Sequence, residues 1–215
     1  MILIGLGNKA RHGKDSVAKF MQEAIPEIKL YSFGAELKYF CQRNQYAFEE
    51  LWELTHPGRV LAPSKDDPIY GNGDILQFIG TEVVRHAYPN AWVDALINRI
   101  DTEDPKIAVI SDVRFLNETK FIKDNGGFLV NVSRKNSDGS PYFDPNRSKT
   151  HISEIGLDDY AGWDFYITAK SGEMDDLKIK SLTVLKNIIN VVADPVYNFV
   201  WGSKEGRTVQ FVGRK

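Results

Sequence analysis

The segment Gly13-Lys14-Asp15-Ser16 carries residue types whose spacing suits the binding of phosphate groups. The ammonium of Lys14 can reach the outer phosphates of a nucleotide as a point charge. The hydroxyl of Ser16 can bind a Mg²⁺ ion that bridges the phosphate oxygens. The backbone adds to this, because the first turn of a helix presents unpaired N–H groups and the positive end of its dipole to an anion. These residues predict a loop that binds a nucleoside triphosphate.

Two elements must position this loop. The apolar run over residues 2–6 is typical of a strand buried on both faces of a parallel sheet, and the pattern after Ser16 is helical. A strand, a glycine-bearing turn and a helix in this order are the context of the motif G-x-x-x-x-G-K-[ST]. The match is incomplete, because Asn8 takes the first-glycine place and Asp15 separates Lys14 from Ser16. An ordinary strand-to-helix turn with a surface lysine is the alternative.

A second candidate set follows another buried-type strand, predicted over residues 106–112. Ligands of open α/β sheets bind outside the carboxyl ends of the strands, so Asp112 is expected to face the same crevice as Lys14. Its carboxylate can hold Mg²⁺ through water, or accept a proton from an acceptor hydroxyl. Capping of a helix that begins near Phe115 is the alternative role. Arg114 follows two residues later and is expected to point at the same crevice.

Two other polar residues have more than one interpretation. Arg85 lies among apolar neighbours in a predicted helix, where it can form a surface salt bridge or grip an acceptor phosphate with both guanidinium nitrogens. His151 belongs to the polar cluster Thr150–Glu154, whose spacing resembles a capping box. The cluster alone predicts no more than the start of a helix.

The composition excludes several classes of protein. The 27 Lys and Arg residues nearly balance the 29 Asp and Glu residues, so no overall basic field favours nucleic-acid binding. The single cysteine, Cys41, excludes an internal disulfide and a cysteine-built metal site, and a packing role is expected. Neither an export signal nor an apolar run approaching membrane-spanning length is visible. We therefore expect a cytoplasmic protein without a membrane partner.

The order of elements favours one α/β domain with a parallel sheet, since strands alternate with helices. Strands are predicted over residues 2–6, 28–33, 106–112, 127–132 and 164–168, and helices over 35–43, 48–54, 74–100 with a break at Pro89, and 173–192. The turn-rich stretch 56–74 is a candidate substrate flap, and the polar stretch 134–150 a candidate lid. From residue 193 the aromatic tail has the pattern of a β-hairpin.

Several segments together resemble the bacteriophage deoxynucleoside monophosphate kinases of the P-loop kinase superfamily. The resemblance covers roughly residues 1–190 and rests on motifs that keep their order and spacing: Arg11–Ser16, Leu76-Gln77 with Gly80-Thr81, Trp92-Val93, Asp112–Arg114 with Glu118, and Thr150–Glu154. It implies a three-layer P-loop kinase fold over residues 1–192, with a five-stranded parallel sheet of order 2-3-1-4-5 flanked by helices and covered by a lid. It also implies ATP and Mg²⁺ as cofactors.

The resemblance implies a role for each matching residue. Binding of the ATP phosphates and Mg²⁺ is the role implied for the loop residues Arg11, His12, Gly13, Lys14, Asp15 and Ser16, and Lys170 would lie near the adenine. Catalytic roles are assigned to Lys14, Asp112, Arg114, Arg134 and Arg147. The resemblance places Asp112 and Arg114 on the acceptor side, where Arg85 and His151 are further candidates for substrate binding, and the candidate metal ligands are Ser16 and Asp112.

These assignments favour an enzyme that transfers the γ-phosphoryl group of ATP to a deoxynucleotide, a small-molecule substrate. One alternative is a related phage kinase that phosphorylates the hydroxymethyl group of 5-hydroxymethyluracil in DNA, for which a flipped base and the aromatic tail make sense. Phosphomevalonate kinases share the Gly-Lys-Asp feature and are a weaker third option. A module that binds ATP without transferring its phosphate is the alternative from another class. A homodimer is compatible with the sequence, and a phage-encoded enzyme would act in the host cytoplasm.

Overall fold

The computed structural model describes residues 1–44, 50–51, 53–56, 76–145, 147 and 149–193. Contacts divide the chain into two units, one formed by residues 1–31 and the chain from 100 onward, the other by residues 32–99. Each unit is described by itself. The predicted hairpin from residue 193 and nearly all of the predicted flap over 56–74 lie outside the described residues.

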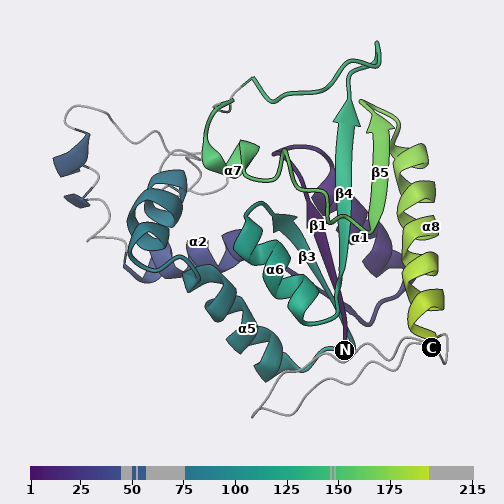
Figure 1. Cartoon of the computed structure of the whole chain (residues 1–215), viewed down its shortest axis with the longest axis horizontal. Coiled ribbons are helices and arrows are strands. Elements are labelled where there is room, and N and C mark those ends of the chain that lie inside the picture. Colours follow the sequence, from purple (N-terminus) through teal and green to yellow (C-terminus); the bar gives the residue numbers. More distant parts are fainter. Residues whose placement is uncertain (45–49, 52, 57–75, 146, 148, 194–215) are drawn as a thin grey trace. The chain divides into compact units, whose positions relative to one another are not determined.

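The first unit contains a five-stranded sheet in which every pairing of neighbours is parallel. Its order is β2-β3-β1-β4-β5, which confirms the predicted order 2-3-1-4-5 (Figure 1). The strands are β1 (Ile2–Gly7), β2 (Ile28–Tyr31), β3 (Ile107–Val113), β4 (Phe128–Lys135) and β5 (Phe165–Lys170). The central β1 is buried along almost its whole length, as its uninterrupted apolar run predicts.

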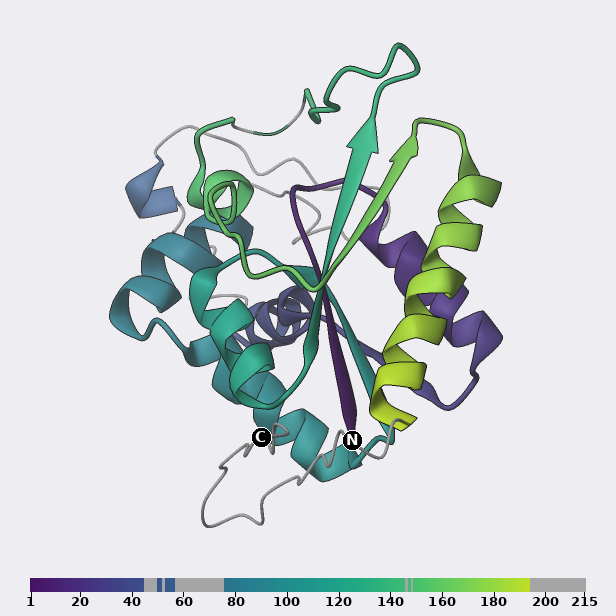
Figure 2. The same cartoon turned by 45° about the vertical axis from the view of Figure 1, so that its right-hand side comes forward.

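Helices cover both faces of this sheet, so the predicted three-layer fold is confirmed. Helices α1 (Lys14–Ala24) and α8 (Met174–Ala193) contact each other on one face, while α6 (Leu116–Asp124) packs on the other (Figure 2). Successive strand residues point to opposite faces. Accordingly, Ile4 and Leu6 join the core beneath α1 and α8, whereas a Cβ on Gly5 would collide with Ile122 of α6.

Gly7 ends β1 at a close contact that leaves no room for a side chain. A Cβ at this position would lie 2.7 Å from Cζ3 of Trp163 and 3.1 Å from the carbonyl oxygen of Val113. Trp163 is itself buried and lies just before β5. The absence of a side chain at Gly7 therefore lets the chain leave the sheet close against Trp163, where the predicted phosphate-binding loop begins.

Several predicted element ends are wrong, those of the second and fourth strands among them. The second strand ends at Tyr31 rather than Phe33, because Ser32 caps α2 (Phe33–Arg43) by accepting a hydrogen bond from the N–H of Ala35 at 3.0 Å. The fourth strand continues to Lys135 instead of ending at residue 132, since β5 supplies pairing partners that far. Arg134 therefore lies on a strand and not in a lid.

The second unit is helical where it is described. It contains α2, the π-helix η1 (Phe78–Arg85) and the first part of α5 (Ala91–Glu103), and residues 50–51 and 53–55 are also helical. Cys41 and Ile79 are fully buried in its core, which accords with a packing role for the thiol. The indole N–H of Trp92 donates to the carbonyl oxygen of Gly80 at 2.9 Å. None of the helices in the described ranges combines the length and the apolar character needed to cross a membrane.

Candidate active site

The loop over residues 8–13 joins β1 to α1 and has an unusual backbone. Asn8, Arg11 and Gly13 adopt positive φ angles of 123°, 55° and 90°. In the described part of the chain, the main-chain N–H groups of residues 11–16 make no hydrogen bond. A left-handed residue followed by a helix N-terminus turns successive N–H groups toward one point, which forms an anion-binding nest. The loop thus has the donors that a chain of phosphates requires.

Lys14, the first residue of α1, directs its side chain back to this loop and is only 5% exposed. Its Nζ donates to the carbonyl oxygens of Asn8 at 3.0 Å and Lys9 at 2.5 Å. The pKa of Lys14 is lowered to about 7, chiefly by burial and in addition by the nearby charge of Arg114, while Asp112 and Asp15 act in the opposite direction. These couplings show that the loop and the end of β3 share one electrostatic environment.

We expect ATP binding to be coupled to protonation of Lys14. Between pH 7 and 10.5 an unfolded lysine is charged, whereas folded Lys14 is largely neutral, so stability should rise with pH across this window. Phosphates beside Nζ favour the ammonium and raise its pKa. Binding of ATP at pH 8.5 should therefore take up a proton, measurable by calorimetry in buffers of different ionisation enthalpy. Lys14→Met should abolish the uptake, and uptake that persists in this variant would assign it to another group.

Asn8 replaces the first glycine of the motif and ties the loop to β4. Its Nδ2 donates to Asn131 Oδ1 at 3.1 Å and to Ser133 Oγ at 2.9 Å, while its Oδ1 accepts from the N–H of Lys9 at 2.8 Å. The side chain thus offsets a backbone conformation that glycine would adopt without strain.

Substitutions at Asn8 should separate these two effects. Asn8→Gly loses the hydrogen bonds but relieves the strain, so we expect a loss of about 1 kcal/mol or less in the free energy of unfolding. Asn8→Ala loses the bonds and keeps the strain, with an expected loss of about 2–3 kcal/mol. Urea denaturation measures both. Equal losses for alanine and glycine would show that the positive φ of Asn8 costs nothing.

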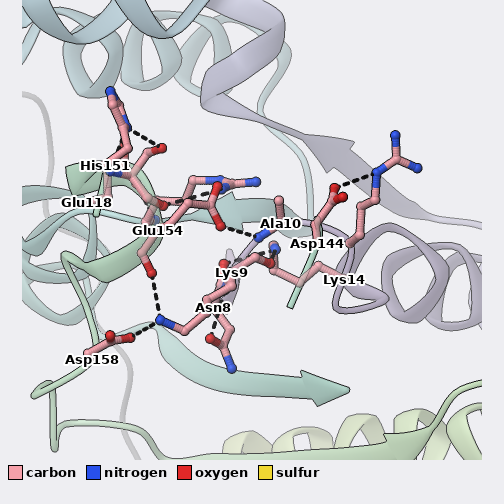
Figure 3. A network of polar contacts seen from close by, with 12 residues as sticks. Asn8, Lys9, Ala10, Lys14, Glu118, Asp144, His151, Glu154 and Asp158 are labelled. Atoms are coloured by element: carbon pink, nitrogen blue, oxygen red, sulfur yellow. Dashed lines mark hydrogen bonds and ion pairs between the residues drawn. The ribbon is translucent and has the colours of Figure 1, made fainter. Parts of the chain in front are cut away.

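A buried carboxylate, that of Glu154, connects the loop to the end of β3 (Figure 3). Its Oε2 accepts from the N–H of Ala10 at 2.9 Å, and its Oε1 accepts from Nη1 of Arg114 at 2.7 Å. Glu154 belongs to the short helix α7 (Ile152–Ile155), and Lys9 reaches the same segment by bonding the carbonyl oxygen of Glu154 and the carboxylate of Asp158. One side chain therefore fixes both a loop N–H group and a candidate catalytic arginine.

Arg114 is held at its backbone as well. Its N–H donates to Oε2 of Glu118 at 2.7 Å, and the N–H of Phe115 donates to the same oxygen at 3.1 Å. Phe115 takes the N-cap position of α6. Asp112 therefore does not cap this helix, which was the alternative to its role at the site. The turn between β3 and α6 is thus fixed from both sides, which restricts where the guanidinium of Arg114 can lie.

Four residues with oxygen-bearing side chains belong to the first turn of α1 and the end of β3. Asp15 and Ser16 occupy the first turn of α1, and Ser111 and Asp112 lie near the end of β3. The hydroxyl of Ser111 donates to Oδ1 of Asp15 at 2.9 Å. Carboxylate and hydroxyl oxygens are the hard ligands that Mg²⁺ accepts, so this group of residues fits the predicted cofactor.

Arg134 extends from the end of β4 toward the loop and the turn after β5. Its Nε donates to Ser171 Oγ at 2.9 Å, and its guanidinium carbon lies 4.1 Å from the centre of the Tyr142 ring. Arg11 is 71% exposed and pairs with the buried Asp144 at 2.9 Å.

His12 is buried beside Arg134. Burial lowers the pKa of His12 to about 4, with a smaller contribution from Lys14, so its ring is neutral near pH 7. Nδ1 accepts from the N–H of Arg134 at 3.3 Å, so the ring proton is on Nε2. Nε2 is buried and has no partner in the described part of the chain.

The other four predicted site residues lie on different segments of the chain. Arg147 is half-buried and its N–H donates to the carbonyl oxygen of Asp144 at 3.1 Å, while Lys170 is exposed at the end of β5. His151, rather than Thr150, is the N-cap of α7, and its Nδ1 accepts from the N–H of Ser153 at 3.2 Å. Arg85 lies on η1 in the second unit. The roles predicted for these four residues stay predictions.

Three residues at the site were not assigned a role from the sequence. Glu154 was interpreted only as part of a possible capping box, although its carboxylate bonds Ala10 and Arg114. Ser111 directly precedes Asp112, and Asp144 lies in the polar stretch after β4. An acid inside a cluster of polar residues was the one available signal for Glu154, and nothing in the sequence singled out the other two.

The comparisons with known proteins show which proteins this chain resembles. No protein-family model matches the chain. A protein of Acanthamoeba polyphaga mimivirus named putative deoxynucleotide monophosphate kinase is 28% identical over 182 residues, which cover 78% of this chain and 88% of that protein. The chain is similar to viral deoxynucleotide monophosphate kinases. The deoxynucleoside-5'-monophosphate kinase of Escherichia phage T5 is 34% identical over 95 residues, which span 40% of this chain and 37% of that relative.

Solved structures support the same fold. The dephospho-CoA kinase from Campylobacter jejuni has a TM-score of 0.51 at 13% identity and covers 88% of this chain and 98% of its own. A protein of Thermus thermophilus has a TM-score of 0.50 at 12% identity and covers 86% of this chain and 96% of its own. The predicted P-loop kinase fold and the resemblance to the phage kinases are therefore confirmed.

Proposed function

We propose that this protein is an ATP-dependent kinase that phosphorylates deoxynucleoside monophosphates to diphosphates. The observation that carries the proposal is the turn from the loop into α1: in the described part of the chain the N–H groups of residues 11–16 make no hydrogen bond, and Lys14 is coupled electrostatically to Asp112 and Arg114. The similarity to viral deoxynucleotide monophosphate kinases supports the choice of acceptor.

Transfer of a phosphoryl group requires placement and positive charge more than covalent chemistry. The N–H groups of residues 11–16 bind the phosphates of ATP, and Lys14 exchanges the carbonyl oxygens of Asn8 and Lys9 for phosphate oxygens. Arg114, fixed by Glu154, supplies charge toward the acceptor phosphate. Arg134 supplies charge from the end of β4, next to the turn at Ser171.

Mg²⁺ is the cofactor expected with ATP, and the residues present fit it. Asp15, Ser16 and Asp112 offer carboxylate and hydroxyl oxygens next to the phosphate-binding loop. When bound, the ion would supply positive charge that neutralises the charge developing on the phosphates. The protein's own part is to place these oxygens and to keep Lys14 away from bulk water, in which its charge would be screened.

The acceptor of a nucleotide kinase is already ionised, so the reaction needs no general base. Asp112 would have to accept a proton only if the acceptor were a hydroxyl, as in the phosphorylation of hydroxymethyluracil in DNA. The names of the similar proteins give no support to that acceptor. The nucleotide acceptor is therefore the better supported one.

A transfer assay tests the proposal directly. The protein is incubated with Mg²⁺ and ATP labelled in the γ-phosphate, together with each deoxynucleoside monophosphate, plain DNA or DNA containing hydroxymethyl pyrimidines. We expect label in one or more deoxynucleoside diphosphates. Label in DNA alone would contradict the proposed acceptor. ATP binding without any transfer would identify a binding module instead of an enzyme.

A further inference from the structure

The hydrogen bond between Asp15 and Ser111 joins two groups that are exchanged relative to the usual P-loop arrangement. In that arrangement the residue after the loop lysine is a serine or threonine that holds Mg²⁺, and an aspartate lies on another strand. Here the residue after Lys14 is Asp15, and the residue on β3 that bonds it is Ser111. Relative to the usual arrangement, the carboxylate is now on α1 and the hydroxyl on β3.

The backbone of β3 shows how Ser111 comes to face α1. The pairing of β1 with β3 shifts between Gly5 and Gly7: Gly5 lies opposite Ile110, and Gly7 lies opposite Val113. β3 therefore places Ser111 and Asp112 where β1 places a single residue, which is a β-bulge. Bulges redirect side chains and are frequent beside active sites. This bulge gives β3 two polar residues at the site, one bonded to Asp15 and one coupled electrostatically to Lys14.

The carboxylate of Asp15 is well placed to receive a cation. Asp15 is exposed in the first turn of α1, whereas Ser111 is 9% exposed. One carboxylate oxygen of Asp15 accepts the Ser111 hydroxyl, which orients the group and leaves its second oxygen available as a ligand. Nucleotide-bound Mg²⁺ uses one or two protein carboxylates together with phosphate oxygens and water, and a carboxylate is a stronger ligand for it than a neutral hydroxyl.

We propose that Asp15, oriented by Ser111, is the direct protein ligand for the Mg²⁺ of the bound nucleotide, in the place of the usual serine or threonine hydroxyl. The inference rests on the proposed function, because it needs a bound nucleotide. It assigns Ser111 as a positioning residue, which acts through Asp15. It also moves the principal metal contact from Ser16, the hydroxyl that the sequence favours, to the preceding residue.

The test measures metal binding without relying on turnover. The affinity for ATP is determined by calorimetry with Mn²⁺ as the probe and again with EDTA, and the ratio gives the gain due to the metal. Asp15→Asn should reduce this ratio by about 10-fold to 100-fold, and Ser111→Ala should reduce it by a smaller factor. Affinity without metal should stay the same or rise in Asp15→Asn, because a negative charge beside the phosphates is removed.

A matched control and an exchange variant make the test specific. Asp124→Asn removes an exposed carboxylate that pairs with Lys120 at the end of α6, so it should keep the full metal gain. The double variant Asp15→Ser with Ser111→Asp restores the usual arrangement and should recover most of the gain. If Asp15 and Ser111 only stabilised the fold, their variants would bind ATP equally less tightly with and without metal, and this result would overturn the inference.

The outcomes separate the inference from the proposed function. An unchanged metal gain in Asp15→Asn would overturn the inference and leave the kinase proposal standing. An exchange variant that binds ATP without metal but recovers no gain would also overturn it. If the wild-type protein bound ATP in neither condition, the proposed function would fail, and the inference with it.

Discussion

Replacing Lys14 by alanine should lower kcat for phosphoryl transfer by about 10³-fold or more, because a preorganised charge at the transferring group is lost. The fold should survive, since the hydrogen bonds that the Lys14 side chain makes in the described part of the chain go to two loop carbonyl oxygens. Thermal denaturation should show a stability equal to or above that of the wild type, because burial of the Lys14 amine costs free energy. The labelled-ATP assay measures the rate.

Two further variants control this prediction. Lys19 lies exposed on the same helix, so Lys19→Ala should keep wild-type turnover. Lys14→Arg should be nearly inactive despite its charge, because a planar guanidinium does not fit the place of an ammonium between the carbonyl oxygens of Asn8 and Lys9. Unchanged turnover in Lys14→Ala would refute the role of the loop.

Glu154→Gln should cost about 3 kcal/mol of unfolding free energy, because it leaves Arg114 without its charged partner. The Glu154 side chain is 1% exposed and that of Arg114 is 19% exposed, so water compensates only partly. For a chain of this size the loss corresponds to a fall of about 6–12 °C in Tm. Activity should fall as well, since the N–H of Ala10 and the guanidinium of Arg114 both lose their fixed position.

A surface ion pair in the same unit supplies the control. Glu23 contacts Lys178 at 3.2 Å, and both side chains are about half exposed. Exposed pairs contribute about 1 kcal/mol or less, so Glu23→Gln should change Tm by a few degrees at most. Differential scanning calorimetry of the two variants compares them directly. Similar small shifts for both would show that the buried pair at Glu154 is not important for stability.

The sequence predicted the sheet well because its signals are local. Each strand is an apolar run between turns, and the alternation with helices implies parallel pairing. The polar residues Ser133, Arg134 and Lys135 were predicted to lie outside the fourth strand. They belong to it because they pair with residues 168–170 of β5, and this tertiary pairing outweighs their low propensity for strands.

The site was predictable only where it is carried by a contiguous motif. Lys14 and its neighbours could be found from spacing, because a phosphate loop is a local structure. The partners of the loop could not, since Ser111 bonds Asp15 across 96 residues and Glu154 bonds Ala10 across 144. Periodicity and capping patterns carry no information about contacts at such separations, and therefore Glu154 was considered only as a helix cap.

The long separation between Ala10 and Glu154 also has a consequence for biosynthesis. The ribosome makes the phosphate loop among the first residues, but the carboxylate that fixes it emerges 144 residues later. At about 5–20 residues per second this is a delay of roughly 7–30 s. During translation the nascent chain therefore lacks this restraint on its loop. Nucleotide binding should become possible only when α7 has left the exit tunnel.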